Sequence, residues 1–188
     1  MIGFKDEGFV GMERKDDRMN VVIDSLVDGS RRAKGTVVVI DVYRAFTTAA
    51  VAFNREAKKL ILVSEANEAI ALRENGTAEL CIGESDGIKL KGFDYGNSPF
   101  ELSHVDLVGK SIVQCTSAGT LGVASLNADH VGDIFLGSFV VAEATVLALQ
   151  DSNPELIHIV PMGAGGRVRT DEDELCALYL RNLLEGRF

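Results

Sequence analysis

The feature that most constrains the fold is an apolar run that ends in charged residues. Residues 37–40 (VVVI) are four consecutive β-formers, which is typical of a strand buried on both faces. Asp41 follows directly, and Arg44 comes three positions later. Ligands of open α/β sheets lie outside the carboxyl ends of the strands, so this strand carries a carboxylate and a guanidinium to such a place. The alternative is an aspartate that ends a strand and pairs with the arginine.

Strand-like and helix-like segments alternate along the rest of the chain, and the strands are apolar runs. This pattern predicts an α/β fold with a largely parallel or mixed sheet covered by helices. We expect residues 1–18 to be a flexible extension and residues 19–188 to be one α/β domain, with two small subdomains as an option. Strands are predicted at 19–25, 37–40, 59–63, 79–82, 111–115, 133–136 and 156–160, and helices at 45–54, 65–75, 140–150 and 171–184. A further helix is predicted to follow the turn at 116–120 and to run through 126.

The net charge and the cysteine content limit which partners and which cellular compartment we expect for this protein. The chain has 188 residues and a formal net charge of −9, which argues against a nucleic-acid partner. An anion site in such a protein needs local arginines or a bound cation. The three cysteines are scattered and show no metal spacing, and no signal peptide or membrane span is visible, so we expect a cytoplasmic protein.

Three predicted strand ends run into turns of small residues. The first turn, TSAGT, contains Thr116, Ser117, Gly119 and Thr120, and the second contains Gly137 and Ser138. The third, GAGGR, contains Gly165, Gly166 and Arg167. Free backbone amides at such helix starts favour anions, and Arg167 and Arg169 can add forked contacts to phosphate. Each turn alone is better explained as an ordinary strand–helix connection, and only the three turns together with Arg44 and the long loop at 83–99 make an anion site an equal alternative. Neither a P-loop nor a complete dinucleotide motif is present.

Acidic side chains near these ends suggest a bound cation. A phosphate site in an acidic protein is well served by Mg²⁺, which takes one or two carboxylates and the substrate's own oxygens. Thr170 and Asp173 have the spacing of a helix capping box, so we assign Asp173 to capping and Glu172 to function. Ser64 and Gly76 are predicted to bound the helix at 65–75, and residues 29–35 to form a basic connection. Residues 83–99 form a long loop of the kind that carries function.

Five motifs together resemble the 2-phosphosulfolactate phosphatases of the ComB type. They are VVVIDVYRAFTTA, GESDGIKLKGFDYGNSPFE, CTSAGT, LGSF and GAGGRVRTDEDELCA, in the same order and spacing as in that family. The resemblance implies a Mg²⁺-dependent enzyme of coenzyme M biosynthesis with the family's own α/β fold. It implies a site lined by Asp41, Arg44, Glu84, Asp94, Asn97, Ser98, Thr116, Gly119, Thr120, Ser138, Arg167 and Glu172.

Roles follow from the chemistry of these side chains. We expect Asp41, Arg44 and Arg167 to act in catalysis, and Asp41, Glu84 and Glu172 to hold Mg²⁺ because carboxylates are hard ligands. The substrate is then a small phosphorylated anion, bound also by Ser117, Gly165, Gly166 and Arg169.

Some positions depart from the family pattern. Tyr43, Phe46 and Ala118 replace its usual Leu, Thr and Asn. The alternatives are a phosphatase of another phosphorylated hydroxy acid, or a binding module that keeps the anion pocket without turnover. The apolar segment 140–149 could lie at the interface of a homo-oligomer.

Overall fold

The chain folds into two four-stranded sheets, each built largely from parallel strands. The computed structural model describes residues 19–187, so the predicted extension at 1–18 lies outside the described residues. The first sheet has the order β1 (Asn20–Ile23), β8 (Leu156–Pro161), β2 (Gly35–Ile40), β7 (Val131–Gly137), with every pair parallel. The second has the order β3 (Lys59–Val63), β6 (Ser111–Cys115), β4 (Leu80–Ser85), β5 (Ile88–Lys89), with β5 antiparallel.

Helices connect the strands and cover the sheets. They are α1 (Leu26–Arg32), α2 (Ala45–Asn54), α3 (Ala66–Glu74), α4 (Pro99–Leu102), α5 (Gly119–Ala124), the 3₁₀ turn η1 (Phe139–Val141), α6 (Ala142–Ser152) and α7 (Asp171–Leu184). The predicted α/β class with parallel strands and covering helices is confirmed. Within residues 19–187, the longest helices are too short or too polar to cross a membrane.

Strand β2 is buried on both faces, as its run of β-formers predicts. Val38 and Ile40 face the core formed with α6 and α7. Val37 and Val39 face the opposite way, toward Ala45 and Phe46 of α2 and their neighbours. Because alternate residues of a strand point to opposite faces, one strand contributes to both cores.

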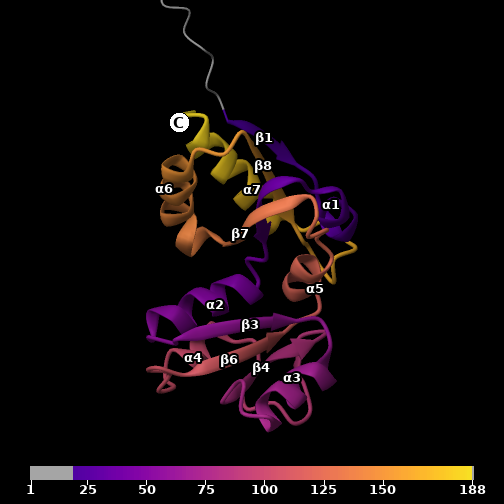
Figure 1. Cartoon of the computed structure of the whole chain (residues 1–188), viewed down its shortest axis with the longest axis vertical. Coiled ribbons are helices and arrows are strands. Elements are labelled where there is room, and N and C mark those ends of the chain that lie inside the picture. Colours follow the sequence, from indigo (N-terminus) through magenta and orange to yellow (C-terminus); the bar gives the residue numbers. More distant parts are fainter. Residues whose placement is uncertain (1–18, 188) are drawn as a thin grey trace, which may run out of the picture.

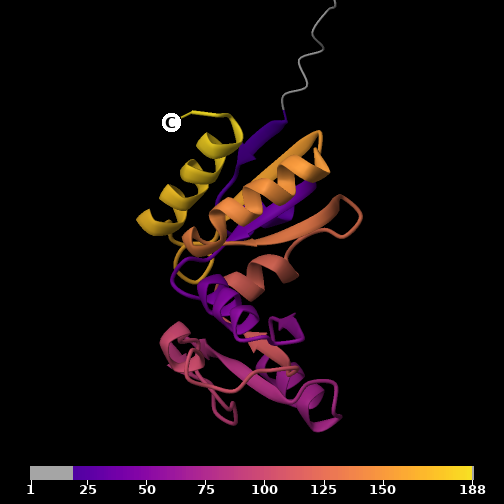
Figure 2. The same cartoon turned by 90° about the vertical axis from the view of Figure 1, so that its left-hand side faces the viewer.

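Helices α2 and α5 lie between the two sheets. Figures 1 and 2 show both helices in the middle of the molecule, with the first sheet above them and the second below. Ala45 and Phe46 of α2 pack into the core of the first sheet, whereas Ala52 packs with Ile82 and Ile112 of the second. The connections that lead into α2 and α5 therefore meet where the sheets come together.

Several local predictions are wrong, each for an identifiable reason. Residues 29–35 are not a connection, because α1 covers the first part of them. Gly29 lowers the helix propensity there, yet it is required, since a Cβ would lie 1.9 Å from the carbonyl oxygen of Asp24. Helix α3 has Glu65 rather than Ser64 at its N-cap, without a side-chain bond. Gly76 does follow the helix, with a φ of +79°.

The predicted long loop contains a β-hairpin. Glu84 and Ser85 pair with Lys89 and Ile88 across the turn Asp86–Gly87. Both turn residues have positive φ, 51° and 79°. An Asp-Gly pair at this spacing is a strong sequence signal for a hairpin, so this turn was recoverable from the sequence.

Candidate functional site

Asp41 lies at the carboxyl end of β2 and is almost fully buried. Its side chain is 5% exposed, and Oδ1 accepts a hydrogen bond of 3.0 Å from the backbone N–H of Ala45 at the start of α2. Gly119 of α5 lies against Oδ2, where a Cβ would come within 2.8 Å of the oxygen. Burial raises the pKa of Asp41 to about 7, and the charges of Asp173 and Glu84 add to this rise. Asp41 is therefore a carboxyl group that can change its protonation near neutral pH.

Asp173 connects two loops around Asp41. Its Oδ1 accepts from the N–H of Val42 at 2.7 Å, and its Oδ2 accepts from the N–H of Gly163 at 2.8 Å. The predicted capping box is therefore wrong, and Thr170 makes no side-chain cap bond either. The first turn of α7 binds the ends of β2 and β8 instead. Burial raises the pKa of Asp173 even though both N–H groups favour its charged form.

Glu84 and Ser117 join β4 to the turn after β6. Glu84 accepts from the backbone N–H of Ser117 at 2.9 Å and from its hydroxyl at 3.1 Å. The N–H of Gly87 in the hairpin turn also donates to Glu84, at 2.6 Å, and the N–H of Asp86 donates to the Ser117 hydroxyl at 3.0 Å. Both predicted residues thus lie together and are held in place by the hairpin.

Thr116 and Thr120 hold the turn after β6 in shape. The N–H of Thr116 donates to the Thr120 hydroxyl at 2.8 Å, and the N–H of Thr120 donates to the Thr116 hydroxyl at 3.2 Å. Both side chains are buried. Their hydroxyls are therefore engaged within the turn, and Gly119 between them provides the close approach to Asp41.

Five of the predicted residues line one cavity of about 630 Å³, which we call the β4 cavity. Its walls come from β4, the β6–α5 turn and the β8–α7 loop. The predicted residues among them are Glu84, Thr116, Ser117, Gly165 and Arg167. Three strand ends that lie far apart in the sequence thus meet around one space.

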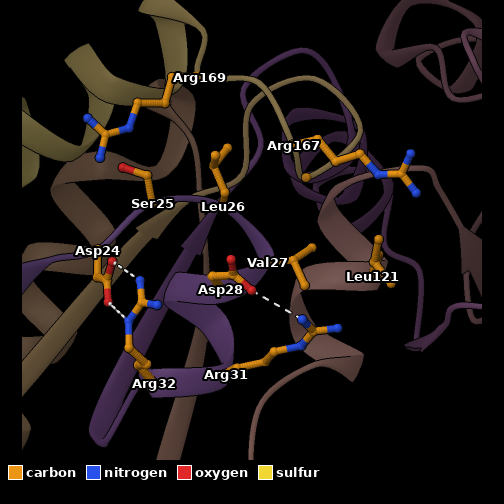
Figure 3. A pocket seen from close by; sticks show the side chains of 11 residues that line it. Asp24, Ser25, Leu26, Val27, Asp28, Arg31, Arg32, Leu121, Arg167 and Arg169 are labelled. Carbon is orange, nitrogen blue, oxygen red and sulfur yellow. Dashed lines mark hydrogen bonds and ion pairs between the residues drawn. The ribbon is translucent and has the colours of Figure 1, made fainter.

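A second cavity of about 650 Å³, the α1 cavity, lies beside it. Helix α1 forms one side and the β8–α7 loop forms the other (Figure 3). Gly166, Arg167 and Arg169 line this space, and Arg167 and Leu121 belong to the linings of both cavities. The predicted anion-binding loop therefore faces two spaces.

Three predicted residues of the segment 83–99 hold the structure together and line neither cavity. Asp94 pairs with Arg73 at 2.8 Å and accepts from the N–H of Cys81. Buried Asn97 contacts Gln114 at 3.3 Å. Ser98 caps α4 by accepting from the N–H of Glu101. The contacts of Asp94 and Asn97 anchor the loop to β4 and β6 of the second sheet, and the contact of Ser98 fixes the start of α4.

The remaining predicted residues are dispersed. Ser138 is fully buried, and within residues 19–187 its hydroxyl has no hydrogen-bond partner. Arg44 and Glu172 are half-buried and line neither cavity. Across the same part of the chain, no three His, Cys, Asp or Glu side chains are grouped as a metal site would require. The predicted set Asp41, Glu84 and Glu172 is therefore not gathered, although the charge of Glu84 does act on Asp41.

Comparison with known proteins agrees with the motifs. The model of the 2-phosphosulpholactate phosphatase family matches residues 21–188. This chain belongs to that family. A "Probable 2-phosphosulfolactate phosphatase" of Bacillus subtilis is 36% identical over 152 residues, which are 79% of this chain and 64% of the relative. Proteins of the same description from Clostridium acetobutylicum and Deinococcus radiodurans are 31% and 35% identical, over 81% and 82% of this chain and 63% of each relative.

The matched region spans less than two thirds of these 2-phosphosulpholactate phosphatase relatives. Two features of the site in this protein were not predicted from the sequence. One is the bridge made by Asp173, since its position in the first helical turn gave a sufficient local explanation. The other is the part of α1 that faces Arg167, since α1 was read as a connection. The run Ser25 to Arg32, with its two serines and two arginines, was the available signal.

Proposed function

We propose that this chain is a Mg²⁺-dependent phosphatase. Its substrate would be 2-phosphosulfolactate or a similar phosphorylated 2-hydroxy acid, and its products the hydroxy acid and phosphate. The observation that carries the proposal is the β4 cavity, where Glu84, the β6–α5 turn and Arg167 surround one space. Membership of the 2-phosphosulpholactate phosphatase family supports the substrate class.

Arg167 is the group proposed to bind the phosphoryl oxygens. It is exposed on the β8–α7 loop and lines the cavity, and its guanidinium matches the geometry of a phosphate. Arg44 lies outside that lining, so we assign it a contact at the edge of the site, near the start of α2. Positive charge at the phosphoryl group stabilises the transition state, because negative charge is spread over its oxygens there.

The donor set fits Mg²⁺ in part. Asp41 is a buried carboxyl group behind the lining of the β4 cavity, and burial and the negative charges of Asp173 and Glu84 raise its pKa. A cation beside Asp41 would offset the cost of burying its charge. Two carboxylates plus substrate oxygens are a usual ligand set for Mg²⁺, so we propose Asp41 and Glu84 as the ligands, with Glu172 outside the set. When bound, Mg²⁺ would neutralise the phosphoryl oxygens.

Two routes of attack on phosphorus are compatible with Asp41 in the site. Water can attack phosphorus directly, with the ester oxygen leaving as the alcohol after it gains a proton. Alternatively, Asp41 can attack first and form an aspartyl phosphate, which water then hydrolyses. In either case the P–O ester bond breaks and water supplies the new oxygen. A phosphoenzyme trapped on Asp41 would exclude the direct route.

The same proposal extends to the pathway, the cellular compartment and the oligomeric state of the protein. The reaction would serve coenzyme M biosynthesis, the protein would act in the cytoplasm, and it would form a homo-oligomer. The exposed apolar residues Phe139, Val140 and Leu147, on η1 and α6, support the last point. Neither a nucleic acid nor a membrane is a proposed partner, given the acidic net charge of −9.

Phosphate release tests the proposal directly. The full chain is assayed with 2-phosphosulfolactate, phospholactate and phosphoglycerate, with Mg²⁺ or with EDTA. We expect turnover of phosphosulfolactate that needs Mg²⁺, and a loss of roughly 100-fold or more in Asp41→Asn. Asp133→Asn on the exposed part of β7 is the matched control and should keep full activity.

Other outcomes separate the alternatives. Turnover of another substrate in the panel would keep the chemistry and change the substrate. No turnover, combined with a rise in melting temperature on adding the phosphorylated compounds, would contradict the phosphatase and support the binding module.

A further inference from the structure

The α1 cavity is a positively charged hollow in an acidic protein. Four arginines and only two aspartates line it, whereas the whole chain carries a net charge of −9. They are Arg31, Arg32, Arg167, Arg169, Asp24 and Asp28 (Figure 3). Concentrated positive charge within a concave surface attracts small anions even when the whole protein is negative.

One of the four arginines is held by the protein itself. Arg32 makes two bonds of 2.8 Å with the carboxylate of Asp24, and this forked pair lowers the pKa of Asp24. Both carboxylate oxygens of Asp24 are engaged in it (Figure 3). The pair therefore forms a fixed edge of the cavity and leaves little negative charge to repel a ligand.

The other three guanidinium groups are available to a ligand. Arg31 makes one bond of 3.1 Å with Asp28, and both side chains are about two-thirds exposed, so the pair contributes little. Arg169 has a single contact of 3.4 Å with Glu174. Arg167 makes no ion pair with any residue in the range 19–187.

Contacts between α1 and the β8–α7 loop fix the two walls relative to each other. The N–H of Val27 donates to the carbonyl of Gly166 at 3.1 Å. Gly166 has a φ of +69°, and a Cβ there would lie 2.6 Å from the Val27 side chain. The hydroxyl of buried Ser25 donates to Glu174 of α7 at 2.7 Å. Arginines from segments more than 130 residues apart in the sequence are thus placed around one space.

We propose that the α1 cavity is a second anion site, separate from the β4 cavity. Its ligand would be a small free oxyanion of the phosphate or sulfonate type, bound by Arg31, Arg167 and Arg169. Guanidinium groups bind such anions through paired N–H donors, and three of them can surround a tetrahedral group. Because Arg167 lines both cavities, an anion in the α1 cavity competes with the β4 cavity for its side chain.

The test is a titration of the metal-free, ¹⁵N-labelled full chain, with no turnover involved. Inorganic phosphate, sulfate and 2-phosphosulfolactate are added in separate titrations at constant ionic strength. The amide signals of residues 26–32 and 166–169 should shift and saturate together. Arg31→Gln should weaken binding by roughly tenfold, which is the loss of one charged hydrogen bond. Arg55→Gln, at an exposed arginine after α2, is the matched control and should bind like the wild type.

Three results would overturn the proposal. The first is no saturable shift in residues 26–32, and the second is equal affinity in wild type and Arg31→Gln. The third is a response to 2-phosphosulfolactate alone, which would make the cavity an extension of the substrate site. If Arg31→Gln does not fold, Arg169→Gln gives the same comparison. None of these results depends on whether the chain is a phosphatase.

Discussion

At the scale of single residues, the site depends on how closely the backbone of Gly119 approaches the carboxylate of Asp41. Gly119 is the clearest case. A Cβ there would lie 2.8 Å from Oδ2 of Asp41 and 2.8 Å from the Cβ of Ala45, and the Asp41 carboxylate is buried and held by the N–H of Ala45. A glycine at this point of TSAGT is therefore a packing requirement, in addition to any role in binding an anion.

Gly119→Ala should destabilise the protein by about 2–3 kcal/mol, because overpacking must displace Asp41 or the start of α2. Urea denaturation monitored by circular dichroism measures this as a lower midpoint. Gly132→Ala is the control, because a Cβ there meets no atom closer than 3.9 Å. A change of less than about 0.5 kcal/mol in Gly119→Ala would mean that the turn adapts freely.

At the scale of secondary structure elements, α7 contributes to the site through one carboxylate in its first turn. Asp173 is 2% exposed and accepts from Val42 and Gly163, which follow β2 and β8. The helix thereby connects the two central strands of the first sheet at their carboxyl ends. Asp171, the first residue of the helix, is exposed and favourably placed in the field of the helix dipole, whereas Glu174 accepts from Ser25 and pairs with Arg169.

Asp173→Ala should cost about 2–4 kcal/mol of stability, since two buried N–H groups lose their acceptor. Asp173→Asn should cost less, because its amide oxygen can still accept from one of them. Asp171→Ala on the same turn is the control and should change stability by less than about 1 kcal/mol. Chemical denaturation of the three variants gives this order. Equal effects for Asp173→Ala and Asp171→Ala would contradict the role assigned to Asp173.

At the scale of the whole molecule, burying Asp41 makes folding stability depend on pH. In the metal-free folded chain its pKa is about 7, against an ordinary value of 3.8. Between about pH 4 and pH 7 the folded state therefore binds more protons at Asp41 than the unfolded state does. The contribution of this group to stability is full at the acid end of that window and is lost as the pH rises through 7.

Asp41→Asn should therefore gain stability relative to the wild type as the pH rises from 5 to 8. About two pH units lie between pH 5 and the folded pKa of about 7, and one unit corresponds to about 1.4 kcal/mol, so the change over this range is about 3 kcal/mol. Urea titrations in EDTA at several pH values measure it, and Asp133→Asn should show no such trend. A difference between wild type and Asp41→Asn that stays constant with pH would contradict the raised pKa.

Local patterns were enough to predict some elements to the residue. The bounds of β3, β6, α2 and α7 agree with the prediction, because each is a clear apolar run or periodic segment between polar residues. Helix α1 was missed because Gly29 lowers its propensity, and only the contact with Asp24 explains that glycine. Asp94 and Asn97, which were assigned to the site, also hold a loop through Cys81 on β4 and Gln114 on β6, and the sequence does not show these distant partners.

By itself, the sequence determined the α/β class, the buried strand β2 and the meeting of several strand ends around one space, because these follow from local patterns and from the geometry of parallel strands. The tertiary structure alone decided that the strands form two sheets, that Asp173 bridges β2 and β8, and that Arg167 lies between two cavities. The physical reason is that these features depend on contacts between separate elements, such as the bond from Val42 to Asp173 across 131 positions, and a local pattern carries no information about such partners.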